Sequence, residues 1–292
     1  MTETAAETSE GLDRDWSKPV LTTTTVAELG ARMPLGLKSG DGKLHQQLAA
    51  RSWRLKEERA LGHRREELQG ENMGRYVSVV LSTMLTRFGD RDWSEWRDKD
   101  TTERELVISQ LWMPDVFYAY VWLRIQAMGN SLPMGLKCPR CQAKLADFDW
   151  IGDLSTLEVR VPASVEDALW QYILQDPLTI RTKQVTKMVM APPRWHHIEA
   201  IGDTTVGAAK ASVIHASIHQ LPEVQEGEIA LDESELDEMS KRDVEALADK
   251  INDNGYGPRM TLEPICPRGH RFDVPIDWRY DNFFGISSPS QG

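Results

Sequence analysis

Two short cysteine-containing turns, far apart in the chain, constrain its fold more than any other feature. The first is Cys138-Pro139-Arg140-Cys141 and the second is Cys266-Pro267-Arg268-Gly269-His270, and together they hold all three cysteines. Each begins with Cys-Pro-Arg, and the proline favours a tight turn before the second candidate ligand. Two thiolates three residues apart, or a thiolate and an imidazole four apart, each make half of a tetrahedral zinc site. The pair therefore predicts two facing zinc knuckles with Cys138, Cys141, Cys266 and His270 as ligands.

The residues around both turns support this interpretation. Residues 144–150 and 271–278 alternate like strands and both end in Asp-Trp, and an apolar residue, Leu136 or Ile265, enters each turn. This pattern predicts a zinc ribbon built from two separated segments, 131–161 and 256–286. Four protein ligands leave no open position on the metal, so we expect one structural Zn2+ per chain. The alternative is two unrelated surface turns with free thiols.

Elsewhere the apolar residues recur mostly with helical spacing. The segment 116–128 is apolar on more than one face, which predicts a central helix that Gly129 ends. Residues 163–190 read as two helical segments broken at Asp176-Pro177, and Ser240 is expected to cap a later helix. Further helices are expected over 45–68, 73–88 and 205–221. The predicted fold is mainly α with a small β zinc ribbon (α+β).

The ribbon divides the chain into regions. Residues 1–24 have few apolar anchors and read as mobile. The ion would close a loop of more than a hundred residues, and a cross-link of that span offsets about 4–5 kcal/mol of chain entropy. We therefore expect zinc to hold an inserted helical lobe against the rest. The predicted parts are a flexible N-terminal tail (1–40), an N-terminal helical region (41–130), the inserted helical lobe (162–255) and a flexible end (287–292).

Composition narrows the possible functions. The 292-residue chain has a formal net charge of -11, which disfavours binding to nucleic acid. It contains neither a signal peptide nor an apolar run of about 20 residues, so we expect no membrane segment. Three cysteines with metal-like spacing suit a reducing compartment better than a disulfide framework. Four aromatic residues near the end of the chain are expected to dock on a core or a partner, namely Trp278, Tyr280, Phe283 and Phe284.

No catalytic motif emerges from the sequence. His215 and His219 have metal-like spacing, but Ala-Ser-Ile between them lacks the glutamate base of a metalloprotease. His196-His197 follows a Pro-Pro turn without a partner pattern. We expect structural or surface roles for all four histidines, and we predict that the protein is not an enzyme.

Several motifs carry a resemblance to a known family. They are the charged run Arg54–Glu58, the aromatic helix from Asp115 to Arg124 with Gly129, the Cys138 knuckle, the helix from Asp243 to Ile251 before Gly257-Pro258, and Phe283-Phe284. In this order they resemble the T-even-like bacteriophage baseplate and tail assembly proteins, also found in phage-tail-like contractile injection systems. That family often has Cys-x-x-Cys in its second knuckle, whereas this chain has Cys266 and His270, so the fourth ligand stays open.

The resemblance implies a non-enzymatic assembly factor or minor structural subunit. Its partners would be other baseplate or tail proteins, and it could remain in the finished virion or tail-like particle. The alternatives are a zinc-ribbon adaptor for nucleic acid, and an uncharacterised enzyme or regulatory binding module.

Overall fold

The computed structural model describes residues 16–38, 42–67, 72–94, 101–145, 151–201, 206–224, 231–277 and 283–284. About 40% of the structure is helix and 31% is strand, so the prediction of a mainly α fold is wrong and the fold is mixed α/β. All strand pairs of the described chain are antiparallel. They form one sheet of four strands, two of three and three of two.

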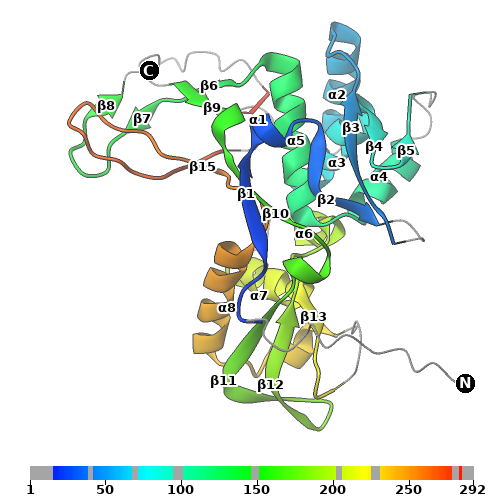
Figure 1. Cartoon of the computed structure of the whole chain (residues 1–292), viewed down its shortest axis with the longest axis vertical. Coiled ribbons are helices and arrows are strands. Elements are labelled where there is room, and N and C mark those ends of the chain that lie inside the picture. The colour runs from blue at the N-terminus through cyan, green and yellow to red at the C-terminus, as the bar shows by residue number, and fades with distance from the viewer. Residues whose placement is uncertain are drawn as a thin grey trace, which may run out of the picture.

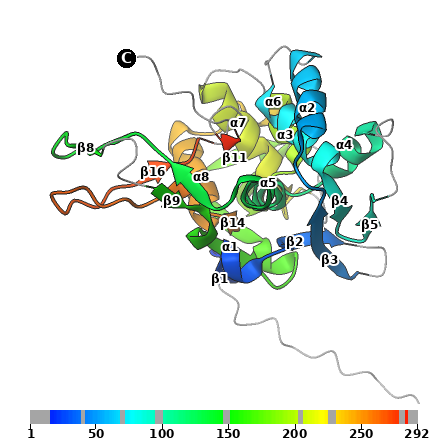
Figure 2. The same cartoon turned by 90° about the horizontal axis from the view of Figure 1, so that it is seen from above.

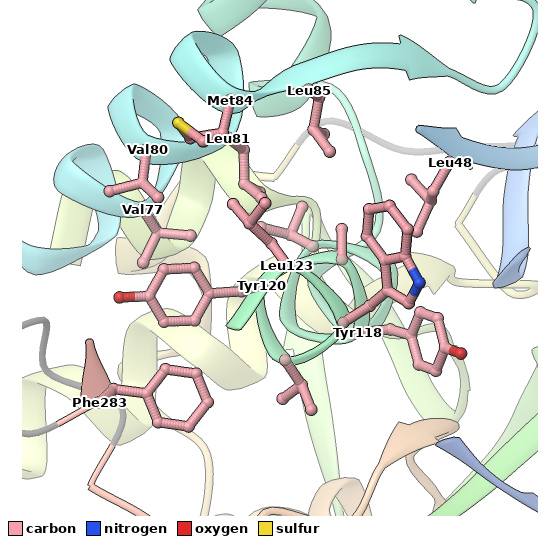
Figure 3. Close-up of a cluster of buried hydrophobic side chains, with 14 of the residues drawn as sticks. Leu48, Val77, Val80, Leu81, Met84, Leu85, Tyr118, Tyr120, Leu123 and Phe283 are labelled. Carbon is pink, nitrogen blue, oxygen red and sulfur yellow. The ribbon is translucent and has the colours of Figure 1, made fainter. Parts of the chain in front are cut away.

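The central element is the long helix α5 (Met113–Met128), which runs through the body of the molecule (Figure 1). Residues Tyr118–Leu123 are all buried, which confirms the predicted central helix. Gly129, at φ 81°, ends it in a conformation that favours glycine. Figure 3 shows the Tyr120 ring between Val77 and Phe283, and the Tyr120 and Phe283 rings stack with centroids 5.2 Å apart. Aromatic packing thus holds residues from three distant parts of the chain together.

Helices and a four-stranded sheet cover α5. The strand order is β2-β3-β4-β5, and helix α3, capped by Asn72, contacts α2, α4, α5 and α6. The expected helices over 45–68 and 73–88 are each partly wrong, because β3 begins the first segment and β4 ends the second. The elements are α2 (Leu55–Glu67), α3 (Met73–Met84), α4 (Thr101–Ser109), α6 (Trp195–Ile201), β3 (Leu44–Ala50), β4 (Leu85–Phe88) and β5 (Arg91–Asp92).

The N-terminal part is ordered where a tail was expected. Residues 21–38 form β1 (Leu21–Thr25), α1 (Val26–Leu29) and β2 (Arg32–Lys38), so the prediction of a flexible tail over 1–40 is wrong for this part. The threonines are β-branched and suit a strand, and β1 pairs along its length with β10 (Glu158–Pro162). The partner strand lies far along the chain, so local polarity alone could not reveal it.

A second hydrophobic core forms a lobe, at the bottom of Figure 1. The lobe combines a β-hairpin with helices, and the prediction of helices over 163–190 is wrong. Trp170, Tyr172 and Leu174 are buried and Ile173 is exposed, which is the two-residue period of a strand. The elements are β11 (Trp170–Ile180), β12 (Lys183–Met190), α7 (Val206–Ser217), β13 (Ile218–Gln220), η3 (Glu233–Leu236) and α8 (Lys241–Asn254).

The break in the hairpin register explains the misleading sequence signal. Asp176-Pro177 lies in the irregular stretch between Ile173 and Leu178, where a proline is tolerated because the ladder is interrupted. Ser240 caps α8 by accepting a bond from the Asp243 N–H, which confirms the predicted cap.

A small sheet joins the lobe to the body. Strand β10 pairs with β1 on one side and with β14 (Gly257–Pro258) on the other, so the two chain ends of the lobe are hydrogen-bonded neighbours. Gly257 has φ 92°, and a Cβ there would lie 2.6 Å from Pro114 Cβ, so this position requires glycine. The short helices η1 (Leu154–Thr156) and η2 (Glu166–Ala168) precede and follow β10.

The two cysteine turns lie on an arm that extends away from α5 in both views (Figures 1 and 2). Both belong to the segments predicted as the ribbon, 131–161 and 256–286, although β10 and β14 of those segments pair in the sheet with β1. The arm consists of separate two-stranded pairs rather than one continuous sheet. Its strands are β6 (Ser131–Pro133), β7 (Leu136–Lys137), β8 (Lys144–Leu145), β9 (Ile151–Asp153), β15 (Thr261–Leu262) and β16 (Val274–Pro275).

The last described residues dock on the body, as their aromatic character predicted. Phe283 and Phe284 are 1% and 4% exposed, and Phe284 stacks on Trp53 with centroids 4.9 Å apart. The predictions for Trp278 and Tyr280, and for a flexible end over 287–292, lie outside the described residues.

Candidate metal centre

The structure brings together the four side chains that the sequence selected. The ligand atoms of Cys138, Cys141, Cys266 and His270 all lie within 4.8 Å of one another. The Cys141 and Cys266 sulfurs are 3.8 Å apart, and His270 Nδ1 lies 3.8 Å from Cys138 Sγ and 3.6 Å from Cys266 Sγ. The predicted proximity is therefore confirmed.

These separations match the edges of a zinc-sized tetrahedron. With Zn–S bonds of about 2.3 Å and a Zn–N bond of about 2.0–2.1 Å, tetrahedral angles place two sulfurs about 3.8 Å apart. The same geometry places a sulfur and a nitrogen about 3.6 Å apart. Three of the six separations between ligand atoms thus have the values of a tetrahedral zinc site, and the others lie within 4.8 Å, so the set can hold a single four-coordinate ion. The cluster is compatible with one metal ion, and the donor set favours Zn2+ over hard cations, which prefer oxygen.

Backbone geometry aims the ligands inward. In the first turn the Gln142 N–H bonds the Cys138 carbonyl at 2.9 Å, and Gln142 itself has φ 59°. In the second turn the Gly269 N–H bonds the Cys266 carbonyl at 2.8 Å, and Gly269 has φ 80°. When the two Cys-Pro-Arg turns are aligned, Gly269 occupies the position of Cys141. The longer imidazole of the next residue, His270, then reaches the cluster as the fourth candidate ligand.

The sulfurs are held in an environment that favours a cation. Burial raises the pKa of Cys138, but backbone N–H groups of its turn and the His270 imidazole lower it to about 6. The Ala143 N–H lowers the pKa of Cys141, yet burial and the neighbouring thiols leave it raised. One sulfur is therefore ready to bind as thiolate, while the crowding opposes ionisation of all three unless a cation neutralises them.

Little apolar packing supports the turns. The buried residues at the tip of the arm are Leu136, Cys138 and Cys266, and the partly buried residues packed against them are Met134, Cys141, Phe272 and Val274. A cluster of this size cannot order a protein segment by apolar burial alone, so the ion would supply most of the local stability.

The structure also places the four remaining histidines of interest in one region. His196, His197, His215 and His219 all line a cleft of about 750 Å³ between the body and the lobe. They do not join the metal cluster, and within the described ranges the arm is the one place where three or more such ligands converge. Sequence spacing could not find this grouping because it depends on how α6 and α7 pack.

A buried carboxylate also escaped the sequence analysis. Asp115, in the first turn of α5, accepts bonds from the Leu35 N–H at 2.9 Å and the Tyr256 hydroxyl at 3.0 Å. Burial outweighs these bonds and raises the pKa of Asp115 to about 6. The carboxylate joins the N-terminal strand, the central helix and the end of the lobe, which is a structural role.

A second buried carboxylate organises the lobe. Asp243 in α8 accepts bonds from the Tyr172 hydroxyl and the Gln175 N–H, both at 2.9 Å. Burial raises the pKa of Asp243, but these bonds and others lower it overall. It thereby anchors the irregular stretch of β11 to the helix.

No known protein family, curated protein or solved structure shows detectable similarity to this chain. Among the residues that the structure describes, no helix has both the length and the apolar character needed to cross a bilayer.

Proposed function

We propose that this chain is a non-enzymatic assembly protein whose arm binds a structural zinc ion and docks on a partner protein. The observation that carries the proposal is the four-ligand cluster at the tip of a projecting arm. A site with four protein ligands leaves no position for a substrate, whereas it holds two exposed turns in a fixed relation.

The charge of the arm indicates the kind of surface that it meets. Lys137, Arg140, Lys144 and Arg268 are exposed around the two turns, although the whole chain has a net charge of -11. A cationic tip on an acidic protein favours an acidic surface on the partner and steers encounter with it.

The particular assembly that we propose is a bacteriophage baseplate or tail, or the equivalent part of a contractile injection system. Its support is the order of motifs from Arg54 to Phe284 that resembles that protein family. In this proposal the partners are other baseplate or tail proteins, met in the cytoplasm of the producing cell.

The test is affinity capture from cells that are assembling particles. We expect wild-type protein to capture identifiable baseplate or tail proteins, and Arg140→Glu with Arg268→Glu to lose them while keeping the metal. The matched control is Arg181→Glu with Lys183→Glu on the β11–β12 hairpin, which should capture them normally. Equal capture by both double variants would contradict docking by the arm, and capture without any tail protein would contradict the assembly.

A nucleic-acid adaptor is the second candidate, because the same four cations could meet phosphates. It predicts an affinity for DNA or RNA that falls steeply with salt and disappears in the Arg140→Glu and Arg268→Glu variant. The net charge of the chain favours the protein partner.

A further inference from the structure

A cleft of about 750 Å³ separates the body from the lobe and is distinct from the metal centre. The body contributes Lys38 at the end of β2 and the segment before α5, and the lobe side contributes α7 and β13. Backbone bonds hold the stretch that leaves β12 of the lobe against the segment before α5: the Met113 N–H donates to the Pro193 carbonyl at 2.8 Å, and the Trp195 N–H donates to the Leu111 carbonyl at 2.7 Å. The cleft therefore lies at a joint whose two sides are already in contact.

The walls of the cleft have an unusual composition for this chain. Four of the seven histidines line it, together with Lys38 and Arg194. None of the 45 Asp and Glu residues of the chain is among the described lining residues. A strongly acidic protein thus has a locally cationic cleft, which attracts anions.

Several of these side chains are held in place. The Arg194 guanidinium stacks on Trp112, 3.4 Å from the ring centroid, and donates to the Gln110 carbonyl at 3.1 Å. His196 Nδ1 lies 3.2 Å from the Ser109 carbonyl, and His215 Nε2 lies 2.8 Å from the Leu231 carbonyl. The two histidine contacts each orient an imidazole through one of its nitrogens. The second nitrogen of each ring remains able to make another contact.

The pKa of His197 reflects its burial and the groups around it. Burial, and to a smaller extent the electrostatic influence of His196, His215 and Arg194, lower its pKa to about 4, and its buried Nδ1 has no hydrogen-bond partner within the described residues. The His196 and His197 ring centroids are 3.9 Å apart. A bound anion beside this ring would favour its protonated form and raise the pKa, whereas a cation would lower the pKa further.

We propose that this cleft binds a small phosphate-bearing molecule. Its volume lies in the range of small-molecule sites, about 300–1,000 Å³, and arginine, lysine and imidazole are donors suited to phosphate oxygens. A metal site is disfavoured, since no three of these imidazoles converge as metal ligands in the described structure. Because both sides of the joint contribute, the ligand would also fasten the lobe to the body.

The proposal is tested by calorimetric titration of the full-length protein with ATP, inorganic phosphate and citrate. We expect saturable binding of at least one phosphate-bearing probe, and a loss of affinity of about tenfold or more in Lys38→Glu and in Arg194→Gln. Lys183→Glu makes the same charge change at the far end of β12 and should alter the affinity less than about twofold. Lys38 is exposed, so its variant should fold even where Arg194→Gln does not.

Three results would overturn the proposal. In the first, neither ATP nor inorganic phosphate binds saturably at millimolar concentration. In the second, citrate is the one probe that binds. In the third, Lys38→Glu and Lys183→Glu lose the same amount of affinity. The metal content and partner capture of the Lys38→Glu variant should be normal, which separates this site from the arm.

Discussion

The body around α5 and the arm that carries the cysteines are stabilised in different ways. In the described chain, 31 buried residues form the main hydrophobic cluster around α5, and Phe283 and Phe284 belong to it. The arm cluster has three buried residues, and two of these, Cys138 and Cys266, are candidate metal ligands. Burial of a large apolar side chain is worth about 1.5–3 kcal/mol, so the body has ample stabilisation without a ligand. The arm does not, and its order should depend on the ion.

The comparison also changes the expected role of zinc. The sequence suggested that the ion holds the inserted lobe, but Arg160 of β10 pairs with Gly257 of β14 at the base of that lobe. Hydrogen bonds and the sheet with β1 therefore close the same loop without the metal. We now expect loss of zinc to disorder the arm and to leave the lobe and body folded.

The largest effect should follow from breaking the metal cluster. Cys138→Ser or Cys266→Ser removes a thiolate from a structural site whose ion contributes on the order of 10 kcal/mol in small domains. We expect loss of bound zinc and rapid tryptic cleavage at Lys137, Arg140 or Arg268, while the body and lobe resist the protease.

The matched control is Arg140→Ser, which changes an exposed residue of the same turn and keeps all four ligands. It should bind zinc and keep the arm resistant at the remaining sites. Cleavage that spreads through the lobe in Cys138→Ser would show that the metal holds the lobe after all.

A smaller loss of stability, affecting the whole fold, is expected from a substitution that creates a cavity in the body. Phe283→Ala removes a ring that is 1% exposed and stacks on Tyr120, which should cost about 3–5 kcal/mol of unfolding free energy. Chemical denaturation measures this loss, and zinc content should stay unchanged. Ile173→Ala removes an apolar side chain that is 72% exposed and should cost less than about 1 kcal/mol. Similar losses in the two variants would contradict docking of the C-terminal aromatic residues.

The pH dependence of stability tests the buried carboxylate beside α5. The pKa of Asp115 is about 6 in the fold, above an unfolded value of about 3.9, so its protonated form is favoured by folding. Its contribution to stability is full below about pH 4 and falls by roughly 3 kcal/mol as the pH rises through 6. In Asp115→Asn this fall should be absent, because the amide stays neutral and can still accept the Leu35 N–H. A stability difference between the two proteins that is constant from pH 4 to 7 would show that the carboxyl titrates normally.

The smallest effect is expected at the tip of the lobe hairpin. Arg181 and Glu235 form an ion pair at 2.8 Å, but the Arg181 side chain is 48% exposed. Water screens such a pair, so Arg181→Gln should leave the melting temperature without a resolvable change. A clear drop in melting temperature would mean that the hairpin tip is more rigid than its exposure indicates.

The features that sequence could predict are those with local signals. Helix α5 has a proline in its first turn, a continuous apolar run and a glycine at its end, so its bounds follow from about sixteen neighbouring residues. The metal cluster has two turns that begin with Cys-Pro-Arg and place two candidate ligands three or four residues apart. Each turn supplies half of a four-ligand site, so the sequence predicts that the two turns meet. Ser240 is likewise predictable from its neighbours, because a serine followed three residues later by an aspartate is a signal for the start of a helix.

The missed features depend on contacts between distant segments. The threonines of β1 looked mobile because their partner strand β10 lies far along the chain, and Asp176-Pro177 resembled a helix break although it interrupts a hairpin. Burial of Asp115 requires both Leu35 and Tyr256 to reach it. Such residues read as ordinary polar positions until the packing of the elements is known.

The measurement that tests the central claim most directly is the zinc content of the purified protein, determined by elemental analysis without chelators. The account predicts about one zinc per wild-type chain, held by Cys138, Cys141, Cys266 and His270, and little or none in Cys266→Ser. Wild-type protein with an ordered, protease-resistant arm and no bound metal would contradict it.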